Sequence, residues 1–155
     1  AAHLRKFMQT PDPISAIVLE AQENGNPAVP IDIPVVGAGD LRQMDGNPKW
    51  RSFARLDWDL GNWGAGIRVN YVDDFYETSV TTSDGDMMPI DSWITTDIYL
   101  DYYFSQESLD GLSLRIGARN LADKKPPIAD ESFGYFSDVH SNRGRYTYAT
   151  LSWAF

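Results

Sequence analysis

The last eleven residues of the chain, RYTYATLSWAF, constrain its fold more than any other stretch. Counting back in twos from Phe155 gives Trp153, Leu151, Ala149 and Thr147, and the residues between them form a second set. Because alternate residues of a β-strand point to opposite faces, the stretch predicts a strand with one set on each face. At about ten residues, such a strand is long enough to cross a bilayer at a tilt. It also suits the edge of a soluble β-sandwich.

The same alternation recurs earlier in the chain. It predicts strands at about 49–60, 63–76, 93–104 and 112–121, followed by the terminal strand at 145–155. The two-residue turn at 61–62 joins the first two strands in a hairpin. If this turn pairs Leu60 with Trp63, then Leu56 faces Ile67, and the apolar sets of both strands fall on one side of the sheet. We therefore expect an all-β fold, an antiparallel meander of about five long strands.

Residues 1–48 have a different character. A short helix is predicted near 13–24, with Asp12 as its N-cap and Gly25 at its C-terminal end. The following sequence is rich in proline, glycine and aspartate and predicts an irregular connection, with one short extended piece at 31–36. A connection of this length is unusual in a compact domain and tends to be functional or mobile.

The strand face opposite the aliphatic stripe is polar. Its charged residues include Arg55, Arg68, Asp97, Arg115 and Arg119. In a soluble sandwich this face would meet solvent, whereas in a membrane barrel it would line a wet lumen, where the charges pair with one another or contact a plug.

The connections between the predicted strands alternate in length. Those before Trp50, at 77–92 (a polar loop) and at 122–144 are long, whereas the other two have two and seven residues. Long loops at one end and short turns at the other are typical of outer-membrane barrels. If the chain ends at the periplasmic rim, the three long connections lie outside the cell.

Composition limits the classes of protein that need to be considered. A chain of 155 residues can bury a sizeable core, and the 13% of aromatic residues suits a strand-rich protein. The net charge of −9 disfavours nucleic-acid binding, and the absence of cysteine excludes disulfides and thiolate metal sites. No apolar run is long enough for a transmembrane helix. Because the N-terminus lacks the apolar core of a signal peptide, we expect a mature chain or a piece of a longer one.

The segment from residue 114 to the end carries several motifs in a fixed order. It resembles the C-terminus of TonB-dependent outer-membrane receptors, where Asn-Leu-x-Asp ends the penultimate strand and a long loop with a proline pair or aromatic residue follows. In that family, Gly-Arg then opens the last strand, which stops on an aromatic residue. The matching residues here are Asn120, Leu121, Asp123, Pro126, Pro127, Tyr135, Gly144, Arg145 and Phe155. The resemblance is firm over about a quarter of the chain.

This resemblance implies a 22-stranded transmembrane β-barrel with an N-terminal plug domain, located in the bacterial outer membrane. It implies import of a scarce nutrient, such as a siderophore, cobalamin or a carbohydrate, with energy from the inner-membrane TonB complex. The implied partners are outer-membrane lipid, the TonB complex through the plug, the barrel-assembly machinery through the terminal strand, and a small-molecule ligand.

Five strands are too few to close such a barrel, and open edges in lipid would leave backbone groups unpaired. We therefore expect the chain to be the C-terminal part of a receptor, without the plug domain. In this interpretation residues 49–155 form the last barrel strands, and residues 1–48 form a long extracellular connection.

Candidate chemistry in the loops is sparse. Asp84 and Asp86 could hold a hard cation, although a solvated acidic turn also explains them, as it does Asp130 and Glu131. The loop aromatics Phe133, Tyr135 and Phe136 can contact a ligand or pack among the loops.

Neither a metal site nor a catalytic triad is expected. His3 and His140 lack metal-ligand spacing, and Asp138, His140 and Ser141 lie too close in sequence to assemble a triad. We therefore predict no cofactor and no enzymatic activity. Two alternatives to the receptor are a soluble all-β ligand-binding module and an outer-membrane barrel enzyme, although no predicted strand supplies a histidine to the latter.

Overall fold

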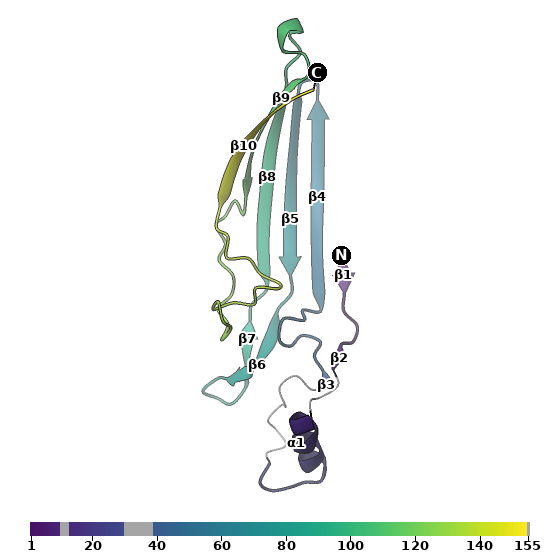
Figure 1. Ribbon diagram of the computed structural model, residues 1–155, viewed down its shortest axis with the longest axis vertical. Coiled ribbons are helices and arrows are strands. Elements are labelled where there is room, and N and C mark those ends of the chain that lie inside the picture. The colour runs from purple at the N-terminus through teal and green to yellow at the C-terminus, as the bar shows by residue number, and fades with distance from the viewer. Residues whose placement is uncertain (10–12, 30–38, 155) are drawn as a thin grey trace.

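A computed structural model describes residues 1–9, 13–29 and 39–154. Its main feature is a six-stranded antiparallel sheet in the order β1-β4-β5-β8-β9-β10, drawn out along the long axis of the molecule (Figure 1). The strands are β1 (Ala2–His3), β4 (Trp50–Leu60), β5 (Trp63–Val72), β8 (Trp93–Tyr103), β9 (Leu112–Arg119) and β10 (Tyr146–Trp153). The predicted meander of five long strands is confirmed. Asp12, the piece at 31–36 and Phe155 lie outside the described residues.

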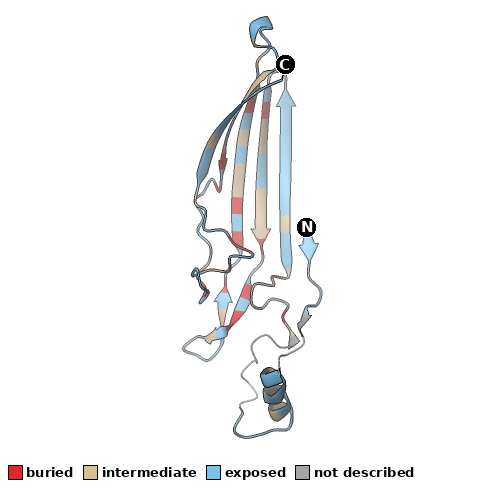
Figure 2. Ribbon diagram, viewed as in Figure 1, coloured by how far each residue is buried: buried red, intermediate tan, exposed pale blue. Residues whose placement is uncertain are grey.

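The register places the apolar residues of all five long strands on one face. Leu56 pairs with Ile67, as predicted from the turn at 61–62, and Ile67 pairs in turn with Ile98. In the described part of the chain, no helix or strand forms a second layer over either face, and the strands are mostly exposed or half-buried (Figure 2). The exposed large residues of the apolar face include Leu56, Trp58, Leu60, Trp63, Ile67, Ile94, Ile98, Leu100, Ile116, Leu151 and Trp153.

The short turns gather at the end of the sheet where β4 finishes. Gly61 adopts the positive φ of 56° that a two-residue hairpin turn requires. The other short connection contains the 3-10 helix η1 (Glu107–Leu109). The Asn62 side chain donates to the Tyr103 carbonyl at 2.8 Å, and the Trp153 indole donates to the Asp110 carbonyl at 3.1 Å. These bonds fix both turns to the strands beside them.

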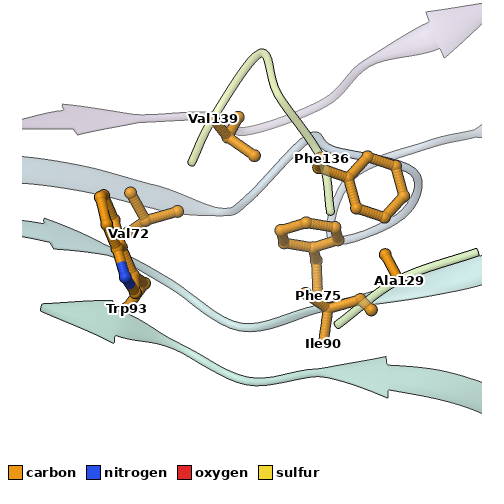
Figure 3. Packing of buried hydrophobic residues seen from close by; sticks show 7 residues of the cluster. All are labelled: Val72, Phe75, Ile90, Trp93, Ala129, Phe136 and Val139. Carbon is orange, nitrogen blue, oxygen red and sulfur yellow. The ribbon is translucent and has the colours of Figure 1, made fainter. Parts of the chain in front are cut away.

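The main buried apolar cluster lies at the opposite end of the sheet, around the end of β5 and the start of β8. Figure 3 shows how its side chains pack. Phe75 and Ile90 are each 1% exposed, and the Phe75 ring meets the Phe136 ring edge-on with centroids 5.0 Å apart. The cluster consists of Val72, Phe75, Ile90, Trp93, Ala129, Phe136 and Val139. The chain length would allow a sizeable core, but the described residues form only a small apolar cluster. This cluster packs the 122–144 segment against the end of β5 and the start of β8.

The prediction of a polar loop at 77–92 is largely wrong. The structure places a second hairpin there, formed by β6 (Phe75–Thr81) and β7 (Met87–Ile90), and the predicted strand 63–76 is interrupted after Val72. The β6 sequence is rich in threonine and includes valine, so it has high strand propensity despite its polarity. Its inward residues are buried by the 122–144 segment, a contact that composition does not reveal.

The N-terminal region contains the expected helix, α1 (Pro13–Glu23). Gly25 has φ +66°, and the Asn26 N–H donates to the Ala21 carbonyl at 3.0 Å, so the helix ends in a glycine cap as predicted. No residue of α1 is buried. Among the described helices, none has the length and apolar character needed to cross a membrane.

The N-terminal region contacts the rest of the fold at two places, while β2 (Met8–Gln9) and β3 (Gly39–Asp40) pair with each other inside that region. The first place is the pairing of β1 with the start of β4, where Ala2 lies opposite Arg51 and His3 opposite Trp50. The second runs along β6, where the Tyr76 N–H donates to the Gln43 carbonyl at 2.8 Å and the Asp45 carboxylate accepts from the Thr78 N–H at 2.9 Å. The region before β4 is therefore anchored beside the second hairpin.

Candidate functional site

The polar face of the sheet carries a row of charges across neighbouring strands. Arg55 of β4 lies opposite Arg68 of β5, which lies opposite Asp97 of β8. Arg119 of β9 lies next in the row, because the adjacent residues Ile98 and Ala118 are paired. The prediction that these side chains share one face is confirmed.

Two glycines on this face leave room for tyrosine rings to lie flat against the sheet. A Cβ atom added at Gly66 would collide with the Tyr99 ring, and one added at Gly117 would lie 2.6 Å from Cζ of Tyr148. Both tyrosine rings therefore lie across neighbouring glycines instead of standing away from the sheet. The charged row runs beside a pair of flat aromatic surfaces.

Two arginines of the polar face are paired with carboxylates. Arg115 forms a two-pronged bond with Asp101, at 2.6 Å from Nε and 2.7 Å from Nη2, and its guanidinium lies 4.2 Å from the Tyr99 ring centroid. Arg55 lies 2.7 Å from the carboxylate of Asp57, which also accepts a hydrogen bond from the Tyr99 hydroxyl. These pairs lie in the half of the polar face that is nearer the short turns.

Arg68 and Arg119 have no ion-pair partner among the described residues. The Nε of Arg68 donates to the Asn70 side chain at 2.8 Å, and its guanidinium lies 4.6 Å from the Phe53 ring centroid. The guanidinium of Arg119 lies 5.9 Å from the ring centroid of Tyr148. Asp97 stands between them in the register but accepts from the Asn120 N–H at 2.9 Å.

Two neighbouring hollows lie along this face. The central one has a volume of about 270 Å³ and contains the arginine row. A larger one of about 570 Å³ opens toward the buried cluster, and Arg68 lines both. The larger hollow is lined by residues that include Arg51, Phe53, Arg68, Asn70, Trp93, Thr95 and Val139.

The Asn-Leu-x-Asp and Gly-Arg motifs meet in space as a clamp. Asn120 is 6% exposed; its side-chain oxygen accepts from the Lys124 N–H at 2.8 Å, and its amide donates to the carbonyls of Lys124 and Arg143. The Asp123 carboxylate accepts from the Arg145 N–H at 2.8 Å. A Cβ atom at Gly144 would lie 2.6 Å from that carboxylate, so a side chain there would push Asp123 away from its bond to Arg145. The clamp closes the 122–144 segment at its base.

Electrostatics strengthen the clamp at neutral pH. The hydrogen bond from the Arg145 N–H, followed by the positive charge of Lys125, lowers the pKa of Asp123 below its ordinary value. Asp123 is therefore ionised whenever the clamp is closed near pH 7. Leu121 contributes little to burial, since its side chain is 39% exposed.

Replacing Asn120 with alanine should open the base of the 122–144 segment. The change removes three part-buried hydrogen bonds to the backbone of Lys124 and Arg143, which we expect to cost about 1–3 kcal/mol in total. Asn120→Gly should cost a similar amount although glycine suits the φ of 48° at this position, which separates the lost bonds from backbone strain. The matched control is Asn142→Ala, an exposed asparagine in the same segment. Hydrogen exchange of the segment measures the effect, and equal exchange in Asn120→Ala and Asn142→Ala would contradict the clamp.

The structure separates the loop residues singled out from the sequence. Asp84 and Asp86 are exposed in the turn that joins β6 to β7, where Gly85 has φ +88°. Within the described ranges, no three His, Cys, Asp or Glu side chains gather in a way that could hold a metal ion. Phe133 is 73% exposed, whereas Phe136 is buried in the apolar cluster. Tyr135 lies between these extremes, 6.5 Å from Phe133 by ring centroids.

Two buried polar residues were not anticipated. Glu77 of β6 is 1% exposed, and its carboxylate accepts from the Asp130 N–H at 3.0 Å and from the Ser79 hydroxyl at 2.9 Å. His140 is 4% exposed, and neither ring nitrogen has a hydrogen-bond partner among the described residues. No sequence signal marks either residue, because each is buried by segments distant in sequence.

Comparison with known proteins bears on these observations. The family described as "TonB dependent receptor-like, beta-barrel" matches residues 20–121, about two thirds of the chain. No curated protein and no solved structure gives a significant match. The family match covers β4 to β9, whereas the clamp motifs lie mostly after it, so the two lines of support are largely independent. The chain belongs to the TonB-dependent receptor β-barrel family.

Proposed function

We propose that this chain forms part of an outer-membrane receptor that binds a small nutrient outside the cell and imports it with energy supplied by the TonB complex. The observation that carries the proposal is the single-layered meander, with an apolar face and a charged face, in a chain of this receptor family. The polar face would then line the lumen, and the two neighbouring hollows would lie on the path of the solute.

The apolar face suits contact with lipid. Its aliphatic residues are uncovered, and an exposed apolar surface of this extent in water would drive association. Aromatic residues lie toward both ends of the strands, as in the girdles of membrane barrels. Trp63 and Tyr102 lie near the short turns with ring centroids 4.7 Å apart, whereas Trp50 and Tyr71 lie near the long connections. A soluble module would need a second layer over this face.

The open edges of the sheet support a larger barrel. Of the described residues, only Ala2 and His3 pair with the outer edge of β4, and no strand pairs with the outer edge of β10. Unpaired backbone groups are strongly unfavourable in hydrocarbon. Further strands of the same receptor would complete both edges, and the terminal strand would be the contact for the barrel-assembly machinery.

The orientation follows from the lengths of the connections. The short turns would face the periplasm, and the N-terminal region, the β6–β7 hairpin and the 122–144 segment would face the outside. Asp84, Asp86 and the exposed Phe133 would then be among the first residues that an incoming solute meets.

Cysteine labelling tests this orientation, because the 155 residues contain no cysteine and any cysteine elsewhere in the receptor is first replaced by serine. In cells that make the receptor, Ser83→Cys in the β6–β7 turn should react with a membrane-impermeant maleimide. Gln106→Cys, an equally exposed polar residue in the opposite connection, should react only after the outer membrane is permeabilised. The reverse pattern, or equal labelling of both in intact cells, would rule out the proposed topology.

Uptake assays test the transport activity itself. Cells with and without the receptor are compared for accumulation of labelled iron chelates, cobalamin and oligosaccharides. Uptake of at least one of these should depend on the receptor and should stop when an uncoupler collapses the proton-motive force. Receptor-dependent uptake that survives the uncoupler would argue for passive diffusion through a pore.

A further inference from the structure

Among the described residues, the arginines at the centre of the polar face outnumber the carboxylates beside them by four to three, the carboxylates being Asp57, Asp97 and Asp101. Four arginines line the hollow of about 270 Å³, and Asp97 is the one acidic residue in its described lining. The four are Arg55, Arg68, Arg115 and Arg119. This concentration stands out because the chain as a whole carries a net charge of −9.

The four arginines fall into two pairs with different roles. Arg55 and Arg115 already have carboxylate partners in Asp57 and Asp101. Arg68 and Arg119 have no carboxylate partner in the described part of the chain, and Asp97 between them accepts from the backbone of Asn120. The guanidinium groups of Arg68 and Arg119, on either side of Asp97, are therefore available to bind a ligand.

The orientation of Arg68 leaves its fork of donors free. Among the described residues, only Asn70 accepts a hydrogen bond from Arg68, through Nε, while the Phe53 ring supports the guanidinium. The planar Nη groups that remain match the paired oxygens of a carboxylate or a phosphate. Because the side chain is already held, less conformational entropy is lost when an anion binds.

The hollow also has flat aromatic walls, and it lies next to the larger hollow. Gly66 and Gly117 let the Tyr99 and Tyr148 rings lie close to the sheet, and both rings line the space beside the arginines. Arg68 is shared with the larger hollow, which leads toward Trp93 and the long connections. An anion could therefore reach the arginines from the end that we propose faces the outside.

Resting on the proposed function, we propose that this four-arginine hollow binds a carboxylate or phosphate group of the transported solute. Arg68 and Arg119 provide the direct contacts, while Arg55 and Arg115 remain paired with Asp57 and Asp101. The site selects anionic solutes over neutral ones of similar size. The competing occupant is a carboxylate side chain from another part of the receptor.

Calorimetric titration of the purified whole receptor with citrate, inorganic phosphate and sucrose tests the proposal. The receptor should bind at least one of the two anions and not sucrose, more weakly as salt is added. The double variant Arg68→Gln, Arg119→Gln should weaken anion binding at least tenfold. Arg5→Gln, an exposed arginine outside both hollows, should leave it unchanged. The single variants Arg68→Gln and Arg119→Gln provide the same comparison should the double variant fail to assemble.

Two results would overturn the proposal. One is undiminished anion binding by the double variant. The other is an intact receptor that binds neither anion and melts at a lower temperature when Arg68 and Arg119 are replaced, which would show that a carboxylate of the receptor occupies the hollow. Both results leave the cysteine labelling and the energy-dependent uptake unaffected, so failure of this inference is distinguishable from failure of the proposed function.

Discussion

Phe75→Ala should release the 122–144 segment from the end of the sheet. Phe75 is 1% exposed and touches both Phe136 and His140 through its ring, so the truncation leaves a cavity at the centre of the cluster. Removing a buried phenylalanine side chain costs about 3–5 kcal/mol. We expect the free energy of opening this segment to fall by that amount, as measured by hydrogen exchange in the whole receptor. The barrel strands should keep their protection.

Phe133→Ala provides the matched control. Phe133 lies in the 122–144 segment itself but is 73% exposed. Changes at such exposed positions usually alter stability by less than about 0.5 kcal/mol. The two variants remove the same side chain and differ in burial. If both raised exchange equally, the cluster would not be what holds the segment. If neither did, the clamp at Asn120 and the Glu77 bond to Asp130 would suffice without it.

The expected release of the 122–144 segment also affects how solutes reach the polar face. Val72 and Trp93 belong to the cluster and also line the hollow of about 570 Å³, as does Val139 from the segment itself. The segment therefore forms part of the wall at the end of the hollow nearest the long connections. A receptor with an opened segment should differ from the intact one in how quickly solutes enter, even where their affinity is unchanged.

The long strands could be predicted because their signal is local. A period of two, repeated over ten residues, fixes both the strand and its faces, and the turn at 61–62 fixes the register of Leu56 against Ile67. The hairpin β6–β7 was missed because β6 carries several polar residues, β7 has only four residues with a proline among them, and both are buried by distant residues. Glu77, for example, is buried only because residues near Asp130 fold back over it.

The polar face was only partly predictable for a related reason. Alternation places Arg68 and Arg119 on the same face as Asp97, but which arginine finds a carboxylate depends on side-chain direction. Arg115 reaches Asp101, while Arg68 turns to Asn70. The unpaired arginines could therefore be found only from the structure.

The sequence motifs at the C-terminus have a structural explanation that the resemblance did not provide. Asn120 and Asp123 both adopt positive φ, of 48° and 53°, which asparagine and aspartate tolerate better than most residues. Their side chains then reach across to the backbone that precedes β10. The motif spacing matches the two sides of a closed loop, although the partners are about twenty residues apart in sequence.

Acidification should open the same segment through His140. The imidazole is stacked 5.8 Å from the Phe75 ring and lies edge-on to Trp93 at 5.6 Å, with both nitrogens unpartnered. Burial, together with the positive charge of Arg51, lowers its pKa from 6.5 to about 4. The closed segment therefore favours the neutral ring, and protonation favours the open one.

The sign and the pH window follow from these two values. Between pH 6.5 and about 4, the open state binds a proton that the closed state does not, so the stability of the closed state falls as pH falls. It is fully retained above pH 6.5, and the loss levels off below about pH 4 at about 3 kcal/mol, from about 1.4 kcal/mol per pKa unit. The pKa of Asp123 is lowered below 3.8, so its protonation falls beneath this window.

His140→Phe isolates the effect because it keeps an aromatic ring in the cluster and removes the titration. At pH 4.5 the unmodified receptor should show raised hydrogen exchange in 122–144, corrected for intrinsic rates, whereas His140→Phe should stay protected. His3→Phe is the control, since His3 is the other histidine and is exposed beside Trp50. If His140→Phe opened over the same pH range as the unmodified receptor, a carboxylate would have to be responsible, and the buried imidazole would serve packing alone.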